Sequence, residues 1–107
     1  MTFNYTNTFY NVAETSSKFE IIVLKPIEDE DLEYYLMESL TALRVNKAVI
    51  FNFENVDYPQ AQRILDSLAG ATYALEGNKT CICEKLYCFV PSIVKLQVGF
   101  HQYYKNL

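Results

Sequence analysis

The sequence predicts an α/β fold: a compact two-layer sandwich with two helices packed on one face of a roughly five-stranded sheet, in the order βαβαβββ. Short apolar runs alternate with two segments whose apolar residues recur every three or four positions. At 107 residues, 50% of them hydrophobic, the chain has the size of one domain with one core. The two helices can cover only one face of the sheet, yet the first two strands are apolar on both. We therefore expect the protein to dimerise through the sheet.

The first half of the domain is predicted to form a strand, a helix and a strand. Residues 19–24 are apolar at successive positions, which suits a strand covered on both faces. Residues 47–53 show the same pattern and should form a central strand, parallel to the first. Between them, acidic residues 28–31 precede an apolar stripe and complement the helix dipole. The stripe consists of Leu32, Tyr35, Leu36, Leu40 and Leu43.

A second helix begins at a capping box, formed by Asp57 and Gln60, with Pro59 in its first turn. Its apolar stripe is Ala61, Ile64, Leu65 and Leu68. The pattern fits two positions for the C-terminal end of this helix equally well. The helix either stops at Gly70 or continues towards Leu75. A glycine inside it would cost about 1 kcal/mol relative to alanine, which would suggest close approach by another element.

The last third of the domain is predicted to contain three strands. Residues 80–83 and 86–90 form two of them, joined by a tight connection at residues 84–85. The alternation of Val94, Leu96 and Val98 predicts a last strand with one buried face. These assignments divide the chain into a flexible N-terminal arm (1–17), a core domain (18–99) and a C-terminal tail (100–107).

Composition excludes several classes of function. The formal charge of −4 would repel a phosphate backbone, and the nine Lys and Arg are scattered, so we expect no nucleic-acid partner. The sequence has no nucleophile elbow that could act with the single histidine, His101. Its three glycines do not form a phosphate-binding loop. The acidic residues 28–31 could bind magnesium, but the helix dipole explains them better. We predict a protein that is not an enzyme and has no cofactor.

The chain has three cysteines, Cys81, Cys83 and Cys88. Because an odd number is a poor basis for disulfide bonds, a reducing, intracellular setting fits better. They could form a metal site, which would need a fourth ligand, and His101 lies far along the chain. Alternatively, Cys81 and Cys83 lie on one face of a strand and Cys88 in the next, as small apolar residues. We prefer this second interpretation, which involves no metal.

One part of the sequence has a pattern specific enough to compare with a known protein family. Residues 61–77, with Ala-Gln-Arg at the start, Gly-Ala-Thr-Tyr-Ala near the end and a closing glycine, resemble a segment of the SepF family of cell-division proteins. Residues 23–26, 47–53 and 86–92 resemble strands of the same family. The resemblance covers residues 19–98. Proteins of this family link the tubulin-like filament protein FtsZ to the membrane.

The resemblance implies a function and its residues. Tyr87 matches the aromatic residue that binds the C-terminal tail of FtsZ, with Ala61, Cys81 and Phe89 completing the predicted site. Cys81 stands where family members usually carry a basic residue, so affinity or tail preference should differ. Gly70 matches the glycine at which dimers associate through their helices. We therefore expect a homodimer that can polymerise, located in the cytoplasm at the division site near the inner face of the membrane, or in the stroma if plastid-encoded.

The N-terminal arm departs from the family pattern, because Phe3, Tyr5, Phe9 and Tyr10 are not accompanied by any positive charge. Direct lipid binding is not expected from such a segment, although membrane contact through a partner stays open. The chain could be a shortened family member or a fragment of a longer protein. Two other functions also stay open. One is a dimeric regulatory α/β domain that binds a small ligand at the dimer seam; the other is a metal protein or enzyme that uses the cysteines.

Overall fold

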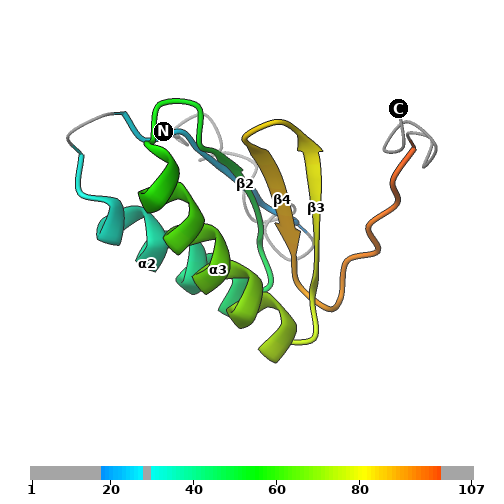
Figure 1. Cartoon of the computed structure of the whole chain (residues 1–107). Helices are drawn as coiled ribbons and strands as arrows, with labels where there is room; N and C mark the ends of the chain where they lie inside the picture. Colours follow the sequence, from blue (N-terminus) through cyan, green and yellow to red (C-terminus); the bar gives the residue numbers. More distant parts are fainter. Residues whose placement is uncertain (1–17, 28–29, 100–107) are drawn as a thin grey trace, which may run out of the picture.

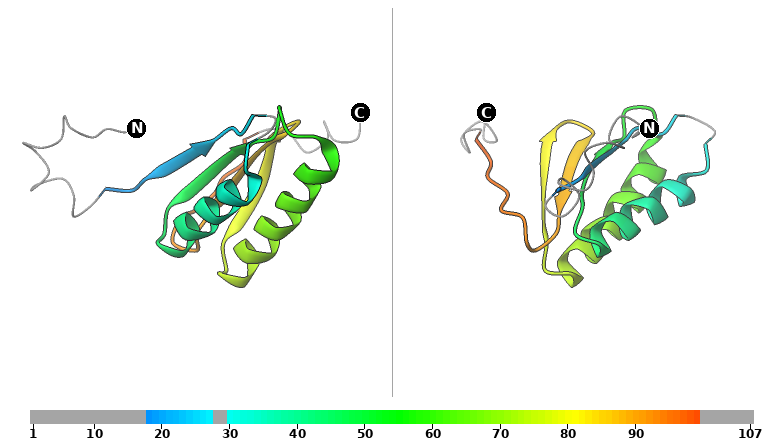
Figure 2. Two further views of the ribbon diagram at one scale, coloured as in Figure 1. Left: turned by 90° about the vertical axis from the view of Figure 1, so that its left-hand side faces the viewer. Right: turned by 180° about the vertical axis from the view of Figure 1, so that it is seen from behind.

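The computed structural model describes residues 18–27 and 30–99 (Figure 1). The elements, in chain order, are β1 (Ile21–Leu24), α2 (Leu32–Arg44), β2 (Ala48–Asn52), α3 (Tyr58–Ala74), β3 (Asn78–Cys83) and β4 (Leu86–Val90). Both helices cover the same face of the sheet, as the views in Figure 2 show. The α/β class and the two-layer arrangement are confirmed. The arm and tail assigned from the sequence, residues 1–17 and 100–107, lie outside the described residues.

The sheet has four strands in the order β1-β2-β4-β3. β1 and β2 are parallel, as predicted for strands joined through a helix, with Ile21 opposite Ala48. β4 pairs antiparallel with both β2 and β3, so it lies inside the sheet. The two edges are therefore β1 and β3. β2 and β4 form the centre of the sheet, with α2 packed on β1 and β2 and α3 packed on β3 and β4.

α3 begins at the predicted cap, Asp57, and α2 begins at Asp31, the last of the acidic residues predicted to precede it. The Asp31 carboxylate accepts a hydrogen bond from the Glu33 N–H (3.0 Å), and the Asp57 carboxylate accepts one from the Gln60 N–H (3.2 Å). α3 passes through Gly70 and ends at Ala74, so the longer of the two predicted helices is correct. Gly70 is exposed, and a Cβ built there would meet nothing within 4 Å. Close approach to Gly70 therefore does not occur within the described chain.

The core lies between the sheet and the helices. Val49, Phe51 and Phe53 alternate along β2 and its exit, and Phe89 of β4 joins them. Ile64 and Leu68 of α3 complete the centre, each fully buried. The Thr72 hydroxyl, also buried, donates to the Leu68 carbonyl oxygen at 2.7 Å, which satisfies it inside the helix. Apolar spacing in the sequence thus corresponds to one continuous core.

One sequence prediction about strands is wrong, and another is met on only one face within a single copy. Residues 94–98 do not form a strand in the described structure, because no edge of the sheet pairs with them, and the sheet has four strands instead of five. Residues 19–24 are not covered on both faces either. β1 is an edge strand, and its Ile21 and Val23 are 57% and 65% exposed on the face away from the helices. The strand pattern was right for β1, but coverage depends on neighbours that the described chain does not supply.

Candidate functional site

Tyr87 lies in the middle of β4, opposite Phe51 on one side and Cys81 on the other. Its ring stands edge-on to Phe53, with ring centroids 5.9 Å apart, and is nearly parallel to Phe89 at 6.4 Å. Phe53 and Phe89 are 2% and 0% exposed, whereas Tyr87 is only half-buried. The aromatic row of the core therefore reaches the surface at Tyr87.

The start of α3 brings two further side chains to this place. Tyr58 is the first residue of α3 and is 76% exposed. Ala61 follows it by three positions, so both lie on one side of the helix, and Ala61 packs against the core. Cys81 is opposite Tyr87 in the β3–β4 pairing, and Tyr58 contributes to the raised pKa of Tyr87. We call Tyr58, Ala61, Cys81 and Tyr87 the Tyr87 patch.

The electrostatics of the patch keep Tyr87 neutral. Burial raises the pKa of its hydroxyl above the ordinary value of 10.0, and the neighbouring Cys81 and Tyr58 raise it further. A neutral phenol both donates and accepts hydrogen bonds. The Cys81 thiol is directed to the Cys83 carbonyl oxygen at 3.2 Å. The patch therefore presents an aromatic ring that is held by its neighbours and ends in a hydroxyl, together with Tyr58 and Ala61 of α3.

Of the four predicted tail-binding residues, Cys81 and Tyr87 are cross-strand neighbours, Ala61 packs against the same core as Tyr87, and Phe89 lies within that core. Phe89 is fully buried, so it supports the Tyr87 ring from the core and has no surface for a partner. Sequence reasoning missed Tyr58. Its position directly after the helix cap and one turn before Ala61 was a signal that could have found it. Gly70 lies nine residues beyond Ala61, about 14 Å along the helix, and is separate from the patch.

Cys88 lies in the strand after Cys81 and Cys83, as predicted, but Cys81 and Cys83 do not share a face. The pairing of β3 with β4 shifts between Cys81 and Cys83, as in a β-bulge. Cys81 is opposite Tyr87 and Cys83 is opposite Leu86, so Cys81 and Cys83 belong to opposite faces instead of one. Cys81 and Cys83 are exposed, and burial of the half-buried Cys88 raises the pKa of its thiol. Within residues 18–27 and 30–99, no group of three or more His, Cys, Asp or Glu side chains could hold a metal ion.

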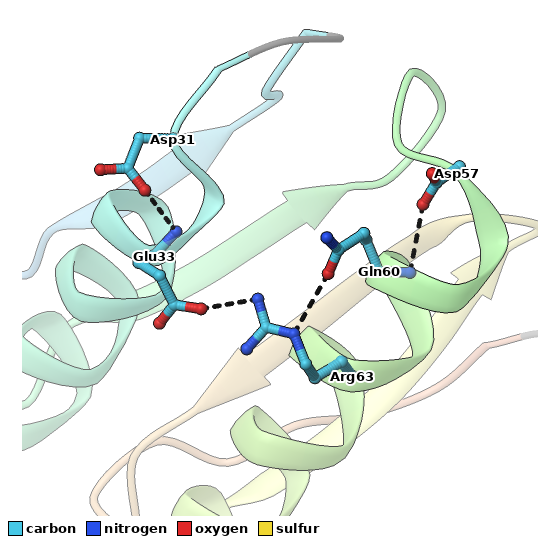
Figure 3. A network of polar contacts seen from close by, with 5 residues as sticks. All are labelled: Asp31, Glu33, Asp57, Gln60 and Arg63. Carbon is cyan, nitrogen blue, oxygen red and sulfur yellow. Dashed lines mark hydrogen bonds and ion pairs between the residues drawn. The ribbon is translucent and has the colours of Figure 1, made fainter.

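An open cavity of about 770 Å³ lies elsewhere, where β1 and β2 end and both helices begin. Its carboxylates already have partners: Glu30 accepts from the Ile27 N–H and the Tyr35 hydroxyl, Glu54 pairs with Lys25, and Asp57 caps α3. Beside it, Arg63 pairs with Glu33 at 2.6 Å and donates to Gln60 at 3.1 Å, which ties α3 to α2 (Figure 3). These contacts hold the two helix starts together. The predicted site residues do not line this cavity.

Neither described helix has the length and apolar character needed to cross a membrane.

Comparison with known proteins identifies the family. The sequence profile described as "Cell division protein SepF" matches residues 21–96. The chain is 70% identical over 98 residues to the "Cell division protein sepF homolog" of Cyanophora paradoxa, which covers 91% of each protein. It is 38% identical to the "Cell division protein SepF" of Trichodesmium erythraeum, over 73% of this chain and 35% of that relative. The chain thus spans most of the first relative and about a third of the second.

Solved structures agree at the level of the fold. A SepF-like protein from Archaeoglobus fulgidus superposes with a TM-score of 0.64, at 13% identity, over 78% of this chain and 98% of the other. One from Pyrococcus furiosus gives a TM-score of 0.59 at 17% identity. The profile match and the high identity to a named homologue extend over most of the core. This chain belongs to the SepF family of cell division proteins.

Proposed function

We propose that this protein is a non-enzymatic adaptor that binds the C-terminal tail of FtsZ through the Tyr87 patch and tethers or aligns FtsZ filaments at the division site. Membership of a family of cell division proteins supports the role in division. The observation that carries the proposal is the placement of Tyr87, a partly exposed ring supported by two buried ones. A preorganised aromatic anchor is the feature that most often dominates peptide binding.

The patch favours a mainly apolar contact. None of its four members is a lysine, arginine, aspartate or glutamate. The Tyr87 and Tyr58 rings supply contact area, and their hydroxyls supply hydrogen bonds that fix the orientation of a peptide. A partner bound mainly by such groups should respond weakly to salt, because screening acts on charges. This would distinguish the protein from a relative that carries a basic residue at the position of Cys81.

Self-association is the second part of the proposed function. The face of the sheet away from the helices leaves Ile21 and Val23 exposed, and a two-fold dimer through this open face would cover them. Gly70, exposed and with space for a neighbour, is the proposed contact between dimers on the outer surface of α3. A dimer presents two Tyr87 patches, so it can cross-link two FtsZ tails and gain from bivalent binding.

The proposed location is the cytoplasmic side of the division site, or the corresponding side of a plastid. The proposed link to the membrane is indirect, through a partner, since residues 1–17 carry no lysine or arginine to attract anionic lipid.

Calorimetric titration with the C-terminal peptide of FtsZ from the same source tests the proposal. We expect micromolar binding by the wild-type protein and a loss of at least about 2 kcal/mol in Tyr87→Ala, because a central aromatic anchor is removed. Tyr58→Ala should lose about 1 kcal/mol, since the exposed ring contributes less area. Tyr73→Ala is the matched control. It removes a tyrosine of α3 that is 59% exposed and lies far from the patch.

Circular dichroism and a urea midpoint must show that each variant is folded. Equal binding by Tyr87→Ala and Tyr73→Ala would place the peptide elsewhere. Absence of binding by the folded wild-type dimer would refute the adaptor function. A thermal-shift screen against amino acids and nucleotides would then test the alternative of a ligand-binding regulatory domain.

A further inference from the structure

Residues 93–98 have the pattern of a strand but no strand partner in the described structure. Val94, Leu96 and Val98 alternate with Lys95 and Gln97, which is the pattern of a strand with one covered face. The segment follows Pro91 and contains neither helix nor ladder pairing. Ile93 is 66% exposed and Val98 is 41% exposed. Val94 and Leu96 are half-buried, so the segment is only partly covered within one copy.

The two edges of the sheet differ in how well they are protected against further strands. β3 carries Lys79 and a shift in its pairing next to Cys83, and both features discourage an added strand. β1 reads Ile-Ile-Val-Leu, pairs regularly with β2 and contains no charge, proline or bulge. Natural proteins seldom leave such an edge uncovered. The outer edge of β1 is therefore the one suited to accept a strand.

The path of the segment rules out pairing with β1 of its own copy in this structure. Residues 91–99 run on the side of the sheet opposite the helices (Figure 1). In the left view of Figure 2 they cross behind the sheet, away from the blue edge strand β1 and towards the edge formed by β3. A segment that leaves by the open face and points away from its own β1 can meet that edge only in a second copy.

We propose that residues 93–98 of one copy add as a strand to the outer edge of β1 in a second copy, so that each subunit completes the sheet of its partner. This inference deepens the proposed dimer and depends on it. A dimer with its two-fold axis parallel to the strands places β1 of one copy over β3 of the other, which is where the segment emerges. Two sheets can pack face to face in more than one orientation, and the exchanged strand selects one of them. It also covers the unprotected edge of β1.

Cross-linking between two differently substituted chains tests the exchange. Both chains carry Cys81→Ser, Cys83→Ser and Cys88→Ser; one adds Val23→Cys, and the other adds Leu96→Cys with an affinity tag. After equilibration at a 1:1 ratio, a thiol cross-linker short enough to span neighbouring strands should give the mixed product. Replacing Val23→Cys by Thr80→Cys, on the opposite edge strand, should reduce its yield by about tenfold, because in the proposed dimer the β3 edge of the second copy lies over β1 of the first, away from Leu96.

Other results would overturn the proposal. Products that join two Val23→Cys chains, without the mixed product, would show that two β1 edges pair with each other. Equal yields with Val23→Cys and Thr80→Cys would show that the contact is not specific. Sedimentation of the wild-type protein separates the two hypotheses. A dimer without the mixed product refutes only the exchange, whereas a monomer refutes the proposed dimer together with it. Binding of the FtsZ peptide is measured independently of both.

Discussion

The two faces of the sheet have similar apolar composition but different surroundings. On the face towards the helices, Phe51 and Phe89 are fully buried. On the other face, Ile21 and Val23 of β1 remain mostly exposed, although Ala48 and Val90 are buried there. The covered face explains the stability of one copy. The open face contributes less to that stability, and the proposed dimer would account for its composition.

Tyr87 stands at the boundary of the covered face, and this position gives it two roles. Its inner surface packs on Phe53 and Phe89, and the remainder reaches solvent beside Tyr58. Substitutions on the two faces should therefore separate folding, association and peptide binding. Three substitutions and one change of pH follow, from the largest expected effect to the smallest.

Phe89→Ala on the covered face should lower the free energy of unfolding by about 3–5 kcal/mol, because it leaves a cavity in the core. Urea unfolding followed by circular dichroism measures the loss. Tyr73→Ala, at an exposed tyrosine, should stay within about 0.5 kcal/mol of the wild type. A loss below 1 kcal/mol in Phe89→Ala would contradict the assignment of this residue to the core.

Val23→Glu on the open face should leave the unfolding of one copy almost unchanged and weaken dimerisation by about 2 kcal/mol or more. A carboxylate at this position would lose its hydration in the interface. Sedimentation equilibrium over a concentration series measures the change. Thr41→Glu, which adds the same charge on an exposed position of α2, is the control. Equal dimerisation of the two variants would show that the open face is not the interface.

Gly70→Ala should stabilise a single copy by up to about 1 kcal/mol, since alanine favours the helix and its Cβ meets nothing within 4 Å. The same change should reduce assembly beyond the dimer, if dimers meet at Gly70. Light scattering reports assembly, and thermal unfolding reports stability. Gly77→Ala is the informative contrast: a Cβ there would collide with the Val90 carbonyl oxygen, so this variant should be destabilised.

Alkaline pH should produce the smallest effect. The pKa of Tyr87 is raised in the folded protein, chiefly by burial, so the folded state holds this proton more tightly than the unfolded state. The resulting stabilisation is fully present below the ordinary pKa of 10.0 and is lost as the pH rises through the higher folded value. Urea unfolding at about pH 8 and about pH 11 should show that Tyr87→Phe loses less stability than the wild type. Identical losses would mean that other groups cause the decline.

Local signals in the sequence predicted both helices and the strands that enter the core. The caps at Asp31 and Asp57 and the stripes behind them depend on contacts within a few residues, so they can be recognised without tertiary information. The end of α3 could not be decided in this way. A helix passes through Gly70 when packing on either side outweighs the cost of the glycine, and packing is not local.

The strand of residues 94–98 was predicted from alternation alone and is absent from the described structure. Alternation shows that a segment could cover one face of a sheet, but a strand also needs a neighbour with free N–H and C=O groups. The same limit applies at the candidate site. Alternation puts Tyr87 and Phe89 on one face of β4, and alternation alone does not determine that Phe89 is fully buried while Tyr87 is half-buried.

The sequence by itself determined the α/β class, the two helices, the parallel pair β1 and β2, and the family, because each rests on short-range spacing or on a contiguous motif. Only the tertiary structure decided the order of the strands, the depth of Phe89, the shift that separates Cys81 from Cys83, and the place of Tyr87 between Phe51 and Cys81. These features depend on contacts between residues distant in the chain. Their geometry is set when the whole core packs, and no local pattern encodes it.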